Sequence, residues 1–408
     1  MQFNNIIGQP EVKQRLVHMV QQNRLSHALL FLGKEGSGAL PLAIAFAQYL
    51  VCNSSPVNLQ TEAEVDLFGN PKVELSNLQT NMREDSCSTC PSCVKAQQLI
   101  HPDIHFSYPV VSKKPGSAPV SADYAAEWRE FIQLYPYGNI YDWLVYIGAD
   151  NRQGNITAQE CNEIIRKLNL KSFQSGYKIL IMWMPEYLGK EGNKLLKLIE
   201  EPSENTLFIL ISENESAILT TIVSRCQLIK IPVLQKDAIE KALMERSNCS
   251  PEVAKQLANS SEGNYREALH LLQHADEDFH NLLREWLNSI IKYQPIAQVK
   301  FIEEVARLGR EKQKQFLGYF THFLEQAVRL YVANEEMKEN LLQAIPAKEK
   351  DFISRINKMM SLEQQQAIAE ELNKATYYIE RNANAKLLFH SLTIKIFHIV
   401  KNNMVVTV

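Results

Sequence analysis

The first half of the chain contains several mostly apolar runs, which are separated by sequence of helical pattern. These runs cover residues 26–32, 178–184 and 206–212. Near-continuous apolar runs of this length, bounded by helices, are typical of central strands in a parallel sheet that is covered on both faces. A shorter run over 227–231 predicts one further strand. The pattern therefore predicts an α/β domain built on a parallel sheet.

Helical periodicity replaces this strand pattern from residue 234 onward. We predict a nucleotide-fold domain over residues 1–233, a small helical domain over 234–280 and a longer helical domain over 281–408. No internal repeat of fixed period is visible. The predicted fold class is accordingly α/β followed by all-α.

Two stretches interrupt the predicted sheet domain. The first, 53–86, is polar and mildly acidic, and the second, 107–146, contains a turn-rich segment followed by aromatic residues. These aromatic residues are Tyr124, Trp128, Phe131, Tyr135, Tyr137, Tyr141 and Trp143. The second stretch is interpreted as a small helical insertion that packs on itself, with a surface for a partner or for unstacked bases as the alternative.

Charge and hydropathy narrow the class of protein. A formal net charge of -3 and an isoelectric point near 6.4 argue against a free-standing nucleic-acid binder, because such proteins usually carry a strong basic face. The N-terminal residues lack a charged segment followed by an apolar core, and the apolar run 179–184 is too short to span a bilayer. We expect a cytoplasmic protein whose DNA contacts are shared with partners.

A glycine-rich loop joins the first predicted strand to an apolar helix. Gly33, Gly36 and Gly38 have the spacing of a loop whose backbone N–H groups wrap phosphates at a helix N-terminus. Such a loop also needs a Lys for the β/γ-phosphates and a Ser or Thr for Mg²⁺. Ala39 and Leu40 stand in those places. We therefore expect ATP binding to be weak or absent, and no hydrolysis.

The second core strand lacks the acidic residues that hold Mg²⁺ and orient water in ATPases of this fold. It ends in Trp183 and Met184. Glu186 lies two residues further on and offers a substitute carboxylate, although Pro185 alters the turn. This loss agrees with the loss in the glycine loop.

Three of the seven cysteines are tightly clustered, which favours metal binding in a reducing compartment over a disulfide framework. Cys87, Cys90 and Cys93 recur at two-residue intervals, so a knuckle-like turn directs several sulfurs at one ion. Structural zinc requires four ligands in a tetrahedron. The cluster predicts a zinc site.

The fourth ligand is predicted to be Cys52, with His101 as its rival. The long interval between Cys52 and the cluster does not forbid this pairing, because loop-closure cost grows only logarithmically with length. A zinc module over 52–93 results. An iron–sulfur cluster, a redox switch and free cysteines without metal are the alternatives.

Arg225 follows the third core strand and a short helical segment, so it is expected at an edge of the domain. An arginine donated across an interface stabilises charge on a transferring phosphoryl group. The alternative is a surface arginine in a weak salt bridge.

Several motifs together resemble the delta prime subunits of the bacterial DNA polymerase III clamp loader. They are Ile7-Gly8-Gln9, the run from Arg24 to Ala28, the four cysteines, His101-Pro102-Asp103, the run from Asn193 to Pro202, and Ser224-Arg225-Cys226. The likeness covers residues 1 to about 275. The run 193–202 and the Ser-Arg-Cys triplet are shared with the tau/gamma subunits, but Ala39 and Leu40 place the chain with delta prime.

This resemblance implies an AAA+ module with a RecA-like sheet, a small helical lid and a C-terminal helical collar. The collar would join the chain to tau/gamma and delta subunits in a hetero-pentameric ring. Arg225 would be the arginine finger that completes the ATP site of an adjacent tau/gamma subunit, and Ser212 would occupy a sensor position. Arg266, in the lid segment 263–266, resembles a second sensor, with a solvated helix residue as the alternative.

The function implied is that of a non-hydrolysing stator that helps to load the sliding clamp on primed DNA in replication. Such a chain is no enzyme by itself, although its assembly is classed as a DNA-directed DNA polymerase. Both insertions are longer than the family pattern, and residues 281–408 match it only in helical character.

Two other hypotheses remain. One is an active AAA+ ATPase of the tau/gamma or helicase type, which ATP turnover by the isolated chain would establish. The other is a zinc-dependent nucleic-acid-binding module, which tight binding of primed DNA with a steep salt dependence would favour.

Overall fold

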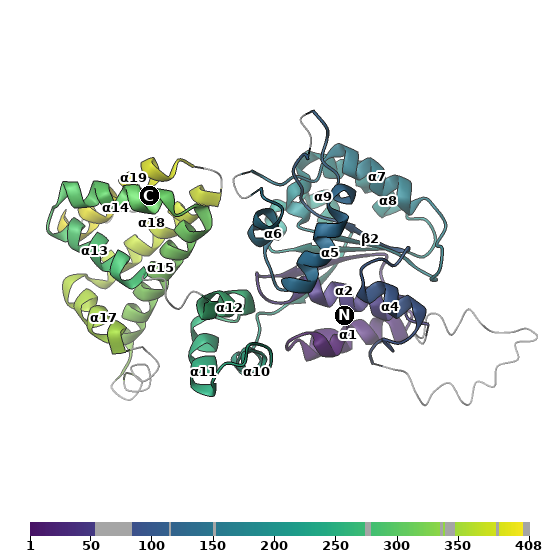
Figure 1. Ribbon diagram of the computed structural model, residues 1–408, viewed down its shortest axis with the longest axis horizontal. Helices are drawn as coiled ribbons and strands as arrows, with labels where there is room; N and C mark the ends of the chain where they lie inside the picture. Colours follow the sequence, from purple (N-terminus) through teal and green to yellow (C-terminus); the bar gives the residue numbers. More distant parts are fainter. Residues whose placement is uncertain are drawn as a thin grey trace, which may run out of the picture. The chain divides into compact units, whose positions relative to one another are not determined.

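The computed structural model describes residues 1–53, 84–113, 116–149, 152–273, 279–334, 338, 347–380 and 383–402. The chain divides into two compact units (Figure 1), unit 1 over Met1–Gln273 and unit 2 over His274–Val408. The helices between residues 234 and 273 thus belong to the same unit as the sheet. The finer division into three domains remains a prediction.

Unit 1 is built on a five-stranded parallel sheet with the order β2-β3-β4-β1-β5. The strands are β1 Ala28–Gly33, β2 Ile104–Ser107, β3 Lys178–Trp183, β4 Thr206–Ser212 and β5 Gln227–Ile231. The α/β fold class is confirmed, and four strands lie where the apolar runs predicted them. The sequence pattern missed β2 because this strand is only four residues long and half-buried.

The helices of unit 1 cover both faces of the sheet or, toward the end of the unit, pack in a separate core with Leu234 and Tyr265. They are η1 Phe3–Asn5, α1 Pro10–Gln21, α2 Ala39–Val51, α4 Pro91–Gln97, η3 Ser121–Tyr124, α5 Ala125–Leu134, α6 Ile140–Tyr146, α7 Ala158–Leu168, η4 Pro185–Leu195, α8 Leu196–Glu200, η5 Glu215–Ala217, α9 Thr220–Val223, α10 Lys236–Ser247, α11 Pro251–Ser260 and α12 Tyr265–Gln273.

Successive strand residues alternate between two cores. Phe31, Ile181 and Ile209 pack with α1 and α2 on one face, whereas Leu30 and Leu210 pack with α7, η4 and α8 on the other. In Figure 1, α7 and α8 accordingly lie on the opposite side of the sheet from α1 and α2. Because side chains alternate along a strand, this double burial explains why the strands are apolar at every position.

The aromatic insertion packs on itself, as predicted, and also against the sheet. Trp128, Phe131 and Trp143 are buried, and Tyr108 stacks on Trp128 with ring centroids 3.9 Å apart. Trp128 also lies 5.3 Å from Trp183 at the end of β3. The other predicted insertion, 53–86, falls almost entirely outside the described residues.

Asp103, at the start of β2, fixes the loop between α7 and β3. Its carboxylate is almost fully buried and accepts the backbone N–H groups of Phe173, Gln174 and Ser175 at 2.6, 2.8 and 2.8 Å. Hydrogen bonds from backbone N–H groups to an ionised carboxylate are stronger than neutral ones. The loop is therefore tied to the edge of the sheet at the amino ends of its strands.

Unit 2 is all-α, as predicted. Its described helices are α13 Phe279–Ile291, α14 Pro295–Arg307, α15 Arg310–Val332, α17 Ala347–Met359, α18 Leu362–Glu380 and α19 Ala385–Asn402. Trp286 is central to their core: it stacks on Phe301 at 4.7 Å, and its indole N–H donates to Thr393 Oγ1 at 3.1 Å.

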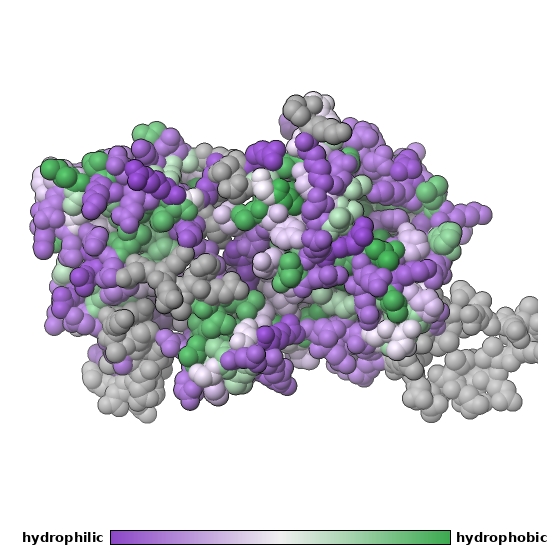
Figure 2. Space-filling view, in the orientation of Figure 1, coloured by the Kyte–Doolittle hydropathy of each residue, from purple (hydrophilic) through white to green (hydrophobic). Residues whose placement is uncertain are grey.

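On the face shown in Figure 2, hydrophilic residues predominate, and hydrophobic residues of unit 1 gather most clearly over α11 and α12. Among the described helices, none is both long and apolar enough to cross a membrane.

We predict that Asp103→Asn lowers the stability of unit 1 in a pH-dependent way. Burial alone would raise the pKa of Asp103, but the hydrogen bonds from residues 173–175 lower it overall. A carboxyl whose pKa is lower in the folded state stabilises above the unfolded-state pKa and loses that contribution as the pH falls. Urea unfolding followed by tryptophan fluorescence should show a deficit of about 1–3 kcal/mol at neutral pH.

The same comparison near pH 3.5 should show a smaller deficit, because Asp103 then takes up a proton more readily in the unfolded chain than in the folded wild type, which favours unfolding. Asp123→Asn, at an exposed position, is the matched control and should change little. A deficit equal at both pH values would contradict the role given to the ionised carboxylate.

Candidate functional site

The glycine-rich loop lies between β1 and α2, where the sequence placed it. Gly36 and Gly38 adopt left-handed φ values of 69° and 87°, which side chains rarely tolerate. Gly38 is the N-cap of α2, so the loop ends at a helix N-terminus, as the sequence predicted. Ala39 and Leu40 are buried within the core.

Protein side chains occupy the space around these glycines. A Cβ on Gly38 would lie 2.9 Å from Tyr137 Cε1, and one on Gly36 would lie 1.8 Å from Asn264 Oδ1. The hydroxyl of Tyr137 accepts the backbone N–H of Ile7 at 2.8 Å, which holds the ring in place. The aromatic insertion and the helical segment 234–273 thus both reach the loop.

Arg266 forms an ion-pair network with two carboxylates beside the loop. Its Nη1 donates to Glu35 Oε1 at 2.9 Å, and its Nε and Nη2 donate to Asp142 Oδ2 and Oδ1 at 2.6 and 2.8 Å. The side chain of Arg266 is only 10% exposed. The alternative of a solvated helix residue is therefore wrong, because the guanidinium is buried against the glycine loop.

Glu35, which lies within the loop, also accepts hydrogen bonds from two residues outside it. Its Oε2 accepts the side-chain amide of Asn139 at 3.1 Å, and its Oε1 accepts that of Asn264 at 3.4 Å. Asn139 is the N-cap of α6, and its capping box includes Asp142. One carboxylate in the loop thus joins the insertion to α12.

At the carboxyl end of β3, Trp183 and Glu186 both make contacts within the protein. Trp183 is buried in the aromatic cluster. Glu186 Oε1 accepts the hydroxyl of Ser212 at 2.6 Å and the backbone N–H groups of Glu213 and Asn214 at 2.8 and 3.1 Å. Glu186 therefore joins the ends of β3 and β4, and Ser212 is fully buried.

Arg225 lies directly after α9, at the surface. Its Nε donates to Glu200 Oε1 at 2.6 Å, and its Nη1 donates to the carbonyl oxygen of Thr221 at 2.7 Å. The side chains of Arg225 and Glu200 are 34% and 45% exposed. The preceding residue, Ser224, lines an open groove of about 1130 Å³ that also includes Gly33 and Lys34 of the glycine loop.

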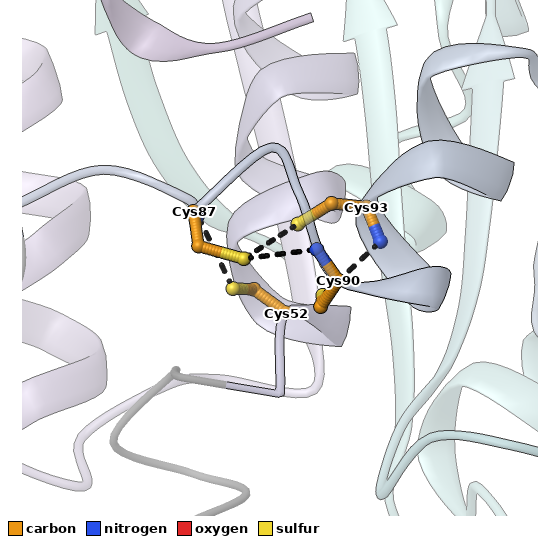
Figure 3. Close-up of side chains that lie close together, drawn as sticks. All are labelled: Cys52, Cys87, Cys90 and Cys93. Carbon is orange, nitrogen blue, oxygen red and sulfur yellow. Dashed lines mark hydrogen bonds between the residues drawn. The ribbon is translucent and has the colours of Figure 1, made fainter.

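The four cysteines predicted to bind a metal come together (Figure 3). Cys52 follows α2, Cys90 is the N-cap of α4, and all four Sγ atoms lie within 4.8 Å of one another. Cys87 Sγ and Cys93 Sγ are 3.8 Å apart, which matches the edge of about 3.8 Å that a tetrahedron with Zn–S bonds of about 2.3 Å requires.

Backbone N–H groups support these sulfurs as they do in a metal-binding knuckle. The N–H groups of Cys90 and Cys93 donate to Cys87 Sγ and Cys90 Sγ, both at 3.4 Å. The hydrogen bond with Cys52 and burial raise the pKa of Cys93, whereas at Cys87 burial is outweighed by hydrogen bonds from Cys90 and Thr89, which lower the pKa. A bound cation would hold all four sulfurs together as thiolates. The donor set fits a structural zinc ion.

His101 does not join the sulfur cluster. Among the described residues, the four cysteines form the group without it. His101 is buried, and its Nδ1 accepts the backbone N–H of Asp103 at 3.2 Å. Of the two rivals for the fourth position, the structure brings Cys52 to the cluster.

Asp85, two residues before Cys87, ties η1 to the cysteine cluster. Its carboxylate accepts the backbone N–H groups of Phe3 and Asn4 at 3.1 and 3.0 Å. Further along, the side-chain amide of Gln9 donates to the carbonyl oxygen of Ser37 in the glycine loop at 3.1 Å. Residues 2–9 thus connect the cluster to the loop.

Sequence reasoning missed four residues of this arrangement: Glu35, Tyr137, Asp142 and Glu200. Glu35 carried a signal, because a carboxylate inside a phosphate-binding loop repels phosphate. Glu200 lies within the motif 193–202, but nothing in the motif indicates that it pairs with Arg225. Nothing in the local sequence could have shown that Tyr137 reaches Gly38 from about a hundred residues away.

The family model for the DNA polymerase III delta subunit matches residues 8–65 and 73–235, more than half of the chain. The chain belongs to this family. It is 28% identical over 263 residues to DNA polymerase III subunit delta' of Bacillus subtilis (strain 168), which covers 64% of this chain and 59% of that protein.

The gamma subunit of Buchnera aphidicola is 23% identical over 279 residues, which cover 67% of this chain and 58% of that protein. The chain therefore spans less than two thirds of the length of these relatives. A crystal structure of a DNA polymerase III gamma subunit-related protein from Thermotoga maritima covers 94% of this chain and 98% of its own, with 15% identity and a TM-score of 0.38.

We predict that Arg266→Met destabilises unit 1. Breaking a buried ion pair by removing one partner costs about 3–5 kcal/mol, and the partial exposure of Glu35 and Asp142 reduces this to about 1–3 kcal/mol. Thermal unfolding should show the loss, and hydrogen exchange should increase in the glycine loop and α12.

The double substitution Glu35→Gln and Asp142→Asn in the Arg266→Met background should recover part of the loss, because it removes the two unpaired charges. Arg24→Met, at an exposed position, is the control for losing an arginine. No change in hydrogen exchange at the loop would contradict the network's role there.

We predict about one zinc ion per chain, because the four thiolates make one closed tetrahedral site. Metal analysis of purified protein should show it, and Cys90→Ser should remove most of the zinc and lower the unfolding temperature. Cys249→Ser, outside the cluster, should keep the zinc. Iron with visible absorption would indicate an iron–sulfur cluster, and protein without metal would contradict both.

Proposed function

We propose that this chain is a clamp-loader subunit of the delta prime type that does not hydrolyse ATP. The observation that carries the proposal is that the chain's own side chains pack against Gly36 and Gly38 of its glycine loop. Tyr137 lies against Gly38, and Glu35 is paired with Arg266.

Charge and packing both oppose a bound triphosphate. Glu35 adds a negative charge to the loop, and phosphate groups near it would be repelled. The buried Ala39 and Leu40 supply neither a cation nor a hydroxyl for Mg²⁺. Arg266, which the family resemblance directs at a nucleotide, is already neutralised by two carboxylates.

Arg225 supports a role in a neighbour's ATP site instead. It is at the surface, and the ion pair that holds it is half-exposed and thus easily exchanged. The groove beside Ser224 offers space for a neighbouring chain. We propose that Arg225 acts as an arginine finger on ATP held by an adjacent tau/gamma subunit.

The proposed partners are tau/gamma and delta subunits in a five-membered ring, with the helices of unit 2 as the collar. Through this ring the chain would help to load the sliding clamp on primed DNA. Zinc at the four cysteines would have a structural role only, since a Cys₄ site leaves no open position for catalysis.

We predict that Arg225→Ala slows ATP turnover in an assembly reconstituted with tau/gamma and delta subunits. An arginine finger is worth about 10³- to 10⁵-fold at the site it serves, so the assembly should lose at least that site's share of turnover. Hydrolysis should be measured with and without clamp and primed DNA, and ring formation by size-exclusion chromatography with light scattering. Arg166→Ala removes another exposed, ion-paired arginine and is the matched control.

The isolated chain should neither bind ATP tightly nor hydrolyse it. Hydrolysis by the chain alone would overturn the proposal in favour of an active ATPase. Unchanged turnover with Arg225→Ala in an intact ring would overturn the finger role. Tight, steeply salt-dependent binding of primed DNA by the chain alone would instead indicate a nucleic-acid-binding module.

A further inference from the structure

Glu200 and Arg225 are brought together by two short helices that share one core. Glu200 is the last residue of α8, and Arg225 follows α9 by two positions. Ile199 of α8 and Ile222 of α9 are both buried in the same hydrophobic cluster. Because these buried residues fix α8 and α9 relative to each other, the packing of the two helices places the carboxylate of Glu200 next to the guanidinium of Arg225.

Contacts within the chain engage all three nitrogens of the guanidinium. Nε donates to Glu200 Oε1, and Nη2 forms an ion pair with the same carboxylate oxygen. Nη1 donates to the carbonyl oxygen of Thr221 at 2.7 Å and lies 3.3 Å from Ser224 Oγ. In this state Arg225 presents few of its donors to an incoming group.

The side chains of Arg225 and Glu200 are both partly exposed, so another anion can replace the carboxylate as the partner of the guanidinium. An ion pair of this kind shifts a population by up to about fivefold. A nucleotide phosphate carries more negative charge than one carboxylate and accepts the guanidinium fork equally well. A phosphate within reach would therefore displace Glu200 at little cost.

We propose that Glu200 is a positioning residue for Arg225. It holds the guanidinium against the subunit's own surface and releases it when a neighbouring subunit's nucleotide phosphate comes within reach. This inference rests on the proposed finger role of Arg225, and it would keep the neighbour's site incomplete until the two subunits are in contact.

The geometry can be tested first in the isolated chain. The Nε–H resonance of Arg225, assigned by its disappearance in Arg225→Ala, should exchange slowly with water in the wild type. Glu200→Gln should speed that exchange, because the charged acceptor is lost, whereas Glu201→Gln should leave it unchanged. Glu201 is the adjacent, exposed carboxylate and controls for loss of charge at this end of α8.

The role is tested in the reconstituted assembly. Glu200→Gln should raise unstimulated kcat by up to about fivefold, leave KM unchanged and reduce the stimulation by clamp and primed DNA. Glu201→Gln should behave as the wild type, and Glu200→Gln combined with Arg225→Ala should match Arg225→Ala alone. Equal unfolding temperatures would show that the variants fold.

The outcomes separate this inference from the proposed function. If Arg225→Ala slows turnover but Glu200→Gln has the wild-type rate and stimulation, Glu200 has no positioning role and the finger remains. A Glu200→Gln variant as slow as Arg225→Ala would overturn release by Glu200, since the carboxylate would then be needed for turnover. Normal turnover with Arg225→Ala would overturn both.

Discussion

One buried guanidinium joins three parts of unit 1 that are distant in sequence. Arg266 from α12 pairs with Glu35 in the glycine loop and with Asp142 at the start of α6. Both carboxylates are partly removed from water, and the guanidinium compensates that loss of hydration. The positions of α12, the loop and the insertion therefore depend on one another, and the close approach of Tyr137 to Gly38 depends on all three.

A second set of contacts extends this dependence to the cysteine cluster. Asp85 holds η1, Ile7 bonds to Tyr137, and Gln9 bonds to the loop. A change at the sulfurs is thus connected through residues 2–9 to the surroundings of the glycines. Each of these hydrogen bonds joins a side chain to a backbone group. They therefore fix the path of the backbone as well as the positions of the side chains.

Much of this architecture was visible in the sequence, and the physical reason is local. Strands buried on both faces must be apolar throughout, so β3 and β4 could be located to the residue or nearly so. Cysteine spacing revealed a metal-type cluster because the ligand geometry of a knuckle is short-range. The short strand β2, with His105 at its centre, gave no comparable signal.

Long-range polar partnerships could not be predicted in the same way. Arg266 was assigned either to a nucleotide or to solvent, because its two carboxylate partners lie 231 and 124 residues away. Arg225 was placed at an edge correctly, but its pairing with Glu200 depends on how α8 and α9 pack. Side-chain pairing of this kind is decided by tertiary structure, so a single sequence does not reveal which distant residues pair.

The burial of Trp183 has a consequence for nucleotide hydrolysis. On the proposed function, a chain able to hydrolyse nucleotide would need more than a lysine and a threonine after Gly38. The tryptophan where an acidic residue would hold Mg²⁺ supports the aromatic cluster, so replacing it would open a cavity in the core before any catalysis was gained. Tyr137 and Glu35 would also have to leave the loop. On the proposed function, nucleotide hydrolysis would therefore require several substitutions together, and the one at Trp183 would lower stability.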